Sequence, residues 1–565
     1  MRLRVLFGFL AAACLGAMLA GDRSAATEES PLSRLVPQGA LLYLEAKDFS
    51  SLLAEWNGSP EKAEWLKSDT YAVFSKSRLF LRLKDAGDQF ASAAGIPPDM
   101  KFVSQVAGGA SAVAIYDIGK LEFLYITRLG AGHGEPALLA ESRSNFETRN
   151  AGGKPFFIRK DPESGREVAF TMDGDYLLLA TREDLLAHAL ELLGGSKAPS
   201  IEGESWWTDA VAAAGRAGDL RLVLNLAKIV PSPYFRTYWI QRNITDTGAY
   251  RAAVSDLILT SSEYREERVL LKTEAGETSA DAGSAAVADL ARLVPADASV
   301  YQIVSGPSPD ASLALLETKL LAPHAGPGIA SKLAPQVQLT SGVTGGGGDL
   351  ETRIDQAPFE VHAQESPAAA LKALLTANPA LASLNVQATE IDADKVFVRI
   401  HTGVVLAGAS DWNEAAVRQA IEKFVRPELT ASGLGTAWQN KAGHAELSGL
   451  WPLALAVRGK YLFVADDARL LETLTATGKP GRAETPAVLV AGFHHATERG
   501  PFVQLVNLLD GHQAGRPVAD GQSPEFFSGN MAGLSRVLSK VASEKVVIRD
   551  AGGKMLQTVT FEWEK

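Results

Sequence analysis

A short motif that occurs twice constrains the fold of this chain more than any other feature. The first copy covers residues 173–186 and the second covers residues 458–471. Six identical residues keep one spacing of 285 positions (459 − 174 = 285): Gly174, Tyr176, Leu177, Ala180, Leu185 and Leu186, matched by Gly459, Tyr461, Leu462, Ala465, Leu470 and Leu471. Each copy predicts a tight glycine turn, a buried strand and a helix. Thr181 and Asp466 are the expected N-caps of the two helices.

A second repeated landmark extends this pattern to the whole chain. Arg-Leu-Val-Pro stands at residues 34–37 and again at 292–295, a spacing of 258 positions (292 − 34 = 258). The smaller spacing assigns extra residues to the second half, near the run of four glycines at 345–348. Short strands, hairpin turns and helices alternate in both halves. We therefore expect two similar α+β domains with antiparallel sheets and packed helices, produced by internal duplication.

The predicted domain boundaries follow from these landmarks and from composition. Residues 1–26 are a predicted signal peptide, because Arg2 and Arg4 precede an apolar run over 5–21 and small residues end at Ala26. The first domain covers 27–273, an Ala-, Gly- and Ser-rich linker covers 274–290, and the second domain covers 291–565. The chain is thus expected to be exported to the periplasm or the extracellular space. An uncleaved N-terminus, or lipidation at Cys14, is the alternative, with membrane anchoring as its consequence.

Composition and motifs exclude several classes of function. The net charge of −11 argues against nucleic acid as a partner. No segment after the signal peptide is apolar enough to cross a membrane. The sequence contains no nucleophile elbow, zinc-protease motif or phosphate-binding loop, and we expect no catalytic residue, cofactor or metal. His494, Glu498 and His512 offer the simplest test of a site assembled from distant residues.

One segment, residues 231–243, has the composition of a binding surface. It holds the six candidate residues for binding a partner or ligand, namely Tyr234, Phe235, Arg236, Tyr238, Trp239 and Arg242. Aromatic residues and arginine are enriched where proteins bind partners. The alternative is that these aromatic side chains pack the two halves together or belong to an ordinary core.

The layout resembles a family of uncharacterised bacterial secreted or envelope proteins with tandem repeated halves. The resemblance depends on the export signal, on the Leu-Val-Pro opening at residues 35–37 with Tyr43, and on the Gly-x-Tyr-Leu units at 174–177 and 459–462. It implies no functional residues, because the family has no assigned activity. We expect a non-catalytic envelope protein that binds a protein partner or a hydrophobic ligand. The alternatives are a periplasmic lipid or lipoprotein carrier, and a hydrolase whose site is not visible in the sequence.

Overall fold

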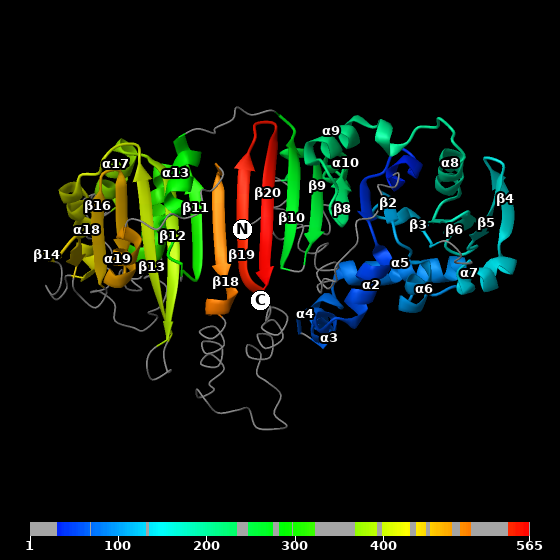
Figure 1. Ribbon diagram of the computed structural model, residues 1–565, viewed down its shortest axis with the longest axis horizontal. Helices are drawn as coiled ribbons and strands as arrows, with labels where there is room; N and C mark the ends of the chain where they lie inside the picture. The colour runs from blue at the N-terminus through cyan, green and yellow to red at the C-terminus, as the bar shows by residue number, and fades with distance from the viewer. Residues whose placement is uncertain are drawn as a thin grey trace, which may run out of the picture. The chain divides into compact units, whose positions relative to one another are not determined.

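The computed structural model describes two compact units. It describes residues 31–67, 69–130, 135–233, 247–260, 262–274, 282–296, 298–321, 368–391, 398–429, 437–447, 452–476, 486–498 and 541–563. Unit 1 contains Met1–Ser279 together with Phe502–Lys565, and unit 2 contains Ala280–Pro501. Each unit combines helices with an antiparallel sheet (Figure 1), which confirms the predicted α+β class.

The sheet of unit 1 is antiparallel throughout. Its strands are β1 (Leu42–Ala46), β2 (Ser111–Asp117), β3 (Glu122–Arg128), β4 (Glu147–Ala151), β5 (Lys154–Lys160), β6 (Glu167–Asp173), β7 (Tyr176–Ala180), β8 (Leu220–Leu224), β9 (Tyr250–Leu259), β10 (Glu263–Lys272), β19 (Val541–Asp550) and β20 (Lys554–Trp563). Pairing gives the order β4-β5-β6-β7-β3-β2-β1-β8-β9-β10-β20-β19. The predicted second domain, 291–565, includes β19 and β20, whereas in the structure β20 pairs with β10 of unit 1.

Helices cover both faces of this sheet (Figure 1). They are α2 (Phe49–Gly58), α3 (Pro60–Lys67), α4 (Asp69–Phe74), α5 (Arg78–Ala94), α6 (Met100–Val106), α7 (Ala137–Ser142), α8 (Glu183–Leu193), α9 (Ser205–Ala214) and α10 (Leu226–Ile229), with 3₁₀ turns η1 (Leu32–Leu35), η2 (Arg143–Asn145) and η3 (Ile201–Gly203). On one face, Tyr43 and Leu178 pack with Leu186 of α8 and Trp207 of α9. On the other, α5 and α6 pack against β6 and β7.

The strands of unit 2 also pair in antiparallel fashion. Its strands are β11 (Val300–Ser305), β12 (Ala380–Ile391), β13 (Val398–Gly408), β14 (Trp438–Asn440), β15 (Ala445–Leu447), β16 (Leu453–Arg458), β17 (Tyr461–Ala465) and β18 (Leu489–His494). Its helices are α13 (Ala282–Ala291), α14 (Pro309–Leu316), a π-helical turn η4 (Glu317–Leu321), α17 (Ala369–Ala377), α18 (Glu414–Leu429) and α19 (Ala468–Thr475). The strand order is β14-β15-β16-β17-β13-β12-β11-β18. It matches the series β4-β5-β6-β7-β3-β2-β1-β8 of unit 1, with β14 in the place of β4 and β18 in the place of β8. Origin by duplication stays a prediction.

The repeated motif forms the expected strand and helix in both units. Gly174 and Gly459 adopt φ values of +61° and +56°, in the left-handed region that glycine occupies at little cost. The predicted N-caps are wrong by one residue. Arg182 precedes α8 without a capping side chain, whereas Asp467 caps α19 by accepting a hydrogen bond from the Leu470 amide.

Thr181 and Asp466 have a different structural role from the one predicted. The Thr181 hydroxyl accepts a hydrogen bond from the Phe123 amide at 2.8 Å, and the Asp466 carboxylate accepts one from the Thr402 amide at 2.7 Å. Each therefore ties the end of its strand, β7 or β17, to the neighbouring strand, β3 or β13. Burial, the largest effect, raises the pKa of Asp466, and the amide hydrogen bond opposes this.

Other local predictions differ from the structure in their ends. The apolar spacing over 71–94 predicts one helical stretch, but the structure divides it into α4 and α5, because Ser77 caps a new helix by accepting a hydrogen bond from the Phe80 amide. The sequence also predicts a helix over 136–148, but α7 ends at Ser142 and is followed by η2 and β4. The predicted linker, 274–290, contains most of α13, whose Val287 and Leu290 are buried. In the described part of the chain, none of the helices combines the length and apolar character needed to cross a membrane.

Candidate functional site: an apolar cavity in unit 1

A cavity of about 550 Å³ lies between helices α2, α5 and α6 and one face of the unit 1 sheet. Its lining is almost entirely apolar, and five of its aromatic side chains are Phe49, Trp56, Phe90, Phe102 and Phe123. Its volume is within the range of about 300–1,000 Å³ typical of small-molecule sites. Such a site favours a ligand that removes a large apolar surface from water.

Strand alternation makes the sheet side of the cavity apolar. Successive side chains of a strand point to opposite faces, so paired residues of neighbouring strands share a face. Leu44 pairs with Val113, Val113 pairs with Tyr125, and Tyr125 pairs with Leu179. All four line the cavity. The floor is therefore one continuous row of side chains across β1, β2, β3 and β7.

The floor continues obliquely across the sheet in both directions. Toward β10 it passes through Leu220 and Leu257, which pair with each other, and ends at Leu259 and Tyr264, which also pair. Toward β6 it ends at Arg166, the residue just before that strand. Arg166 and Tyr264 are seven strand positions apart, a path of roughly 34 Å at about 4.8 Å per position. The cavity is thus elongated.

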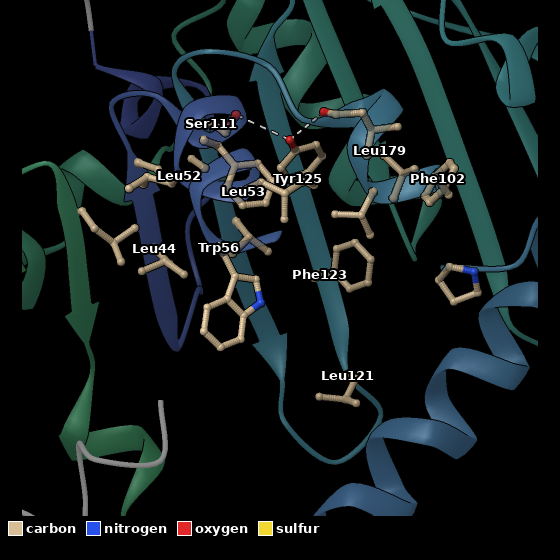
Figure 2. Close-up of a pocket in the computed structure, with 18 of the residues that line it drawn as sticks. Leu44, Leu52, Leu53, Trp56, Phe102, Ser111, Leu121, Phe123, Tyr125 and Leu179 are labelled. Atoms are coloured by element: carbon tan, nitrogen blue, oxygen red, sulfur yellow. Dashed lines mark hydrogen bonds between the residues drawn. The ribbon is translucent and has the colours of Figure 1, made fainter. Parts of the chain in front are cut away.

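Helix α2 forms one wall of the cavity (Figure 2). Asp48 caps the helix by accepting a hydrogen bond from the Ser51 amide at 3.0 Å. The Phe49 and Ser50 amides donate to backbone carbonyls of the loop before β2, both at 2.8 Å. These bonds fix the start of the helix over the sheet. None of its residues is buried, although Leu52, Leu53 and Trp56 line the cavity, so α2 stands off from the sheet.

Polar atoms at one end of the cavity bond to one another and to the backbone (Figure 2). The Tyr125 hydroxyl donates to the Val106 carbonyl at 2.8 Å, and Ser111 Oγ lies 2.6 Å from Thr127 Oγ1. Thr127 Oγ1 also accepts from the Gly108 amide at 3.1 Å. Burial raises the pKa of the Tyr125 hydroxyl, so the phenol stays neutral near pH 7. These hydroxyl groups are therefore already engaged in hydrogen bonds within the protein.

The described lining contains no histidine, cysteine, aspartate or glutamate. Ser111 therefore has no general base beside it within the lining, and the cavity has the composition of a binding site.

The histidine–glutamate hypothesis is tested only in part. His494 Nδ1 lies 2.5 Å from the Ala298 carbonyl oxygen, and Glu498 Oε2 accepts a hydrogen bond from Thr389 at 2.9 Å. Both side chains thus contact structural partners, while His512 lies outside the described residues. Among the described residues, no group of three or more acidic, histidine or cysteine side chains is arranged to hold a metal ion.

The predicted binding segment cannot be compared with this cavity. Tyr234, Phe235, Arg236, Tyr238, Trp239 and Arg242 all lie outside the described residues, and their role stays a prediction.

Sequence analysis missed the cavity and the helix α2 that forms its wall. Asp48 followed by Leu52, Leu53 and Trp56 has the spacing of a capped helix with one apolar side, and this pattern was sufficient to find α2. The cavity itself depends on which strands pair, which local patterns do not show.

Comparisons with known proteins show no family. No family model matches the chain, and no curated protein matches it. Two solved structures, titled as crystal forms I and IV of TP0453, show a weak likeness. They have 13% and 12% sequence identity, cover 44% and 43% of this chain and 81% and 80% of their own, and give TM-scores of 0.23 and 0.21. A likeness this weak carries no argument about function.

Proposed function

We propose that unit 1 binds a hydrophobic ligand with a long apolar chain, and that the protein is a non-catalytic binding protein. The observation that carries the proposal is the elongated cavity of about 550 Å³ between α2 and the sheet. Of the functions considered from the sequence, ligand binding and lipid carriage both need such a cavity. Neither needs a catalytic group in its lining.

Energetics also favour an apolar occupant. Each methylene group moved from water into an apolar site contributes about 0.8 kcal/mol. Native protein interiors are close-packed. Leu52, Leu53 and Trp56 line open apolar space, so a bound apolar chain would give them dispersion contacts that they otherwise lack. A ligand that lies along the floor would contact both the strands and α2.

The test is a pair of substitutions at the middle of the floor. Val113→Trp places a large side chain in the cavity, whereas Val113→Ala removes two methyl groups and leaves the space open. Binding of dodecanol to the full-length protein is measured by isothermal titration calorimetry. We expect binding by the native protein and by Val113→Ala, and little or none by Val113→Trp.

Urea unfolding of each variant shows separately whether the variant is folded. Equal dodecanol affinity in a folded Val113→Trp protein would contradict the proposal, and so would the absence of binding by the native protein. Extraction of the protein purified from its own host then identifies the bound molecule by mass spectrometry. A near-stoichiometric lipid would identify the natural ligand.

A further inference from the structure

Arg166 is the one charged side chain in the described lining of the cavity. It stands at the end of the floor opposite Tyr264. Ala169 of β6 and Leu124 of β3 both pair with Ala180 of β7, so these two residues lie at the same level of the sheet. Arg166 precedes Ala169 by three residues and Leu121 precedes Leu124 by three, so Arg166 is level with Leu121. Leu83, which also lines the cavity, is 46% exposed. A cationic group therefore marks one end of an otherwise apolar cavity.

The bonds of Arg166 leave its charge without an acidic partner at close range. Its Nη2 donates to Gln89 Oε1 at 3.1 Å. Within the described residues, no carboxylate oxygen lies within the 4.0 Å ion-pair distance of the Arg166 guanidinium. The nearby Arg182 differs, since it forms an ion pair with Glu122 at 3.2 Å and a second one with Asp184. An anion beside this half-buried guanidinium would form a charge-assisted hydrogen bond, which is stronger than a hydrogen bond to a neutral group.

The electrostatic surroundings of Arg166 also favour an anionic group beside it. Burial, followed by the charge of Arg82, lowers the pKa of Arg166, and the charges of Glu122, Asp85 and Asp117 only partly offset this. Arg82 itself contacts Asp85 and the Gly119 carbonyl. An anionic group beside Arg166 would favour its charged form.

We propose that the ligand of unit 1 is an anionic amphiphile, whose head group contacts Arg166 and whose apolar chain follows the floor toward Tyr264. This inference rests on the proposed function and adds the chemical class of the ligand. A fatty acid and a phospholipid both offer such a head group. The neutral hydroxyls of Tyr125, Ser111 and Thr127 are already hydrogen-bonded and would not attract the anion.

The test compares dodecanoate with dodecanol, which have equal chain lengths and different charges. The full-length native protein, Arg166→Gln and Arg166→Lys are titrated by calorimetry below the micellar concentrations. We expect the native protein to bind dodecanoate about tenfold more tightly than dodecanol, an effect typical of one charge-assisted contact. Arg166→Gln should abolish this preference and leave dodecanol affinity within about twofold, while Arg166→Lys should keep most of it.

Arg159→Gln is the matched control, because Arg159 lies on the neighbouring strand β5 and does not line the cavity. It changes the net charge equally and should retain the preference for dodecanoate. Parallel titration with dodecyl phosphate distinguishes a phosphate head from a carboxylate head. A preference that survives in Arg166→Gln, or is absent from the native protein, would overturn the inference. Dodecanol binding without any carboxylate preference refutes only the role of Arg166, whereas no binding of either compound refutes the proposed function.

Discussion

The elongated floor predicts how affinity depends on ligand length. The perturbation is a series of straight-chain alcohols from octanol to dodecanol, which keeps the head group constant and neutral. The path from Arg166 to Tyr264 is roughly 34 Å, at about 4.8 Å per strand position. An extended chain advances roughly 1.3 Å per carbon, since a carbon–carbon bond of about 1.5 Å is inclined to the chain axis. Twelve carbons then cover about 16 Å, so dodecanol does not fill the floor.

The expected magnitude follows from burial of the added methylene groups. At about 0.8 kcal/mol each, four methylene groups contribute about 3 kcal/mol. Dodecanol should therefore bind about 200-fold more tightly than octanol, with no plateau between them.

Calorimetry at concentrations below the solubility limit of each alcohol measures the series. Val113→Trp is the control, because its large side chain at the middle of the floor should make affinity nearly independent of the length of the alcohol. If affinity in the native protein stops rising at octanol, or rises by less than about twofold per methylene, against the expected factor of about four, the chain does not lie along this floor.

Three further predictions concern the stability of the two units. Asp256→Ala should reduce the free energy of unfolding by about 3–5 kcal/mol, because it leaves Arg221 buried and unpaired, while Arg221→Met with Asp256→Leu should recover most of the loss in urea unfolding. Burial raises the pKa of Glu45 above its ordinary 4.5, so the contribution of Glu45 to the free energy of unfolding is greatest below pH 4.5 and is lost as pH rises through the raised pKa. Glu45→Gln should remove this part of the pH dependence of urea unfolding, and an unchanged pH dependence in the variant would contradict the prediction. Asp467→Ala should lower stability by about 1 kcal/mol through loss of the α19 cap, whereas Arg182→Ala at the uncapped start of α8 should have a much smaller effect.

The sequence predicted the parts of the fold that depend on local chemistry. The turn at Gly174, the strand β7 and the helix α8 each follow from neighbouring residues, and all three form where expected. The N-cap was misplaced by one residue because Thr181 and Arg182 both stand before the helix. The competing hydrogen bond from Phe123, 58 positions earlier in the chain, decided the outcome.

The candidate site was not predictable in the same way. Arg166, Val113 and Leu257 contribute to one floor because β6, β2 and β9 belong to one sheet, with five strands between the outer two. No local pattern states that order. The predicted binding segment was chosen instead for its composition, which indicates what a side chain can contact and not where it lies.

The open cavity depends on the helix that follows the first strand. In unit 1, α2 begins soon after β1 and buries none of its residues. In unit 2, α14 and η4 follow β11 and bury Leu316, Leu320 and Leu321 in the core. The strands of the two units follow the same order, so the described difference between the units at this place is how closely the helix after the first strand packs on the strands. Ligand binding in unit 1 would therefore depend on the distance at which the Asp48 cap and the Phe49 and Ser50 amides hold α2 from the sheet.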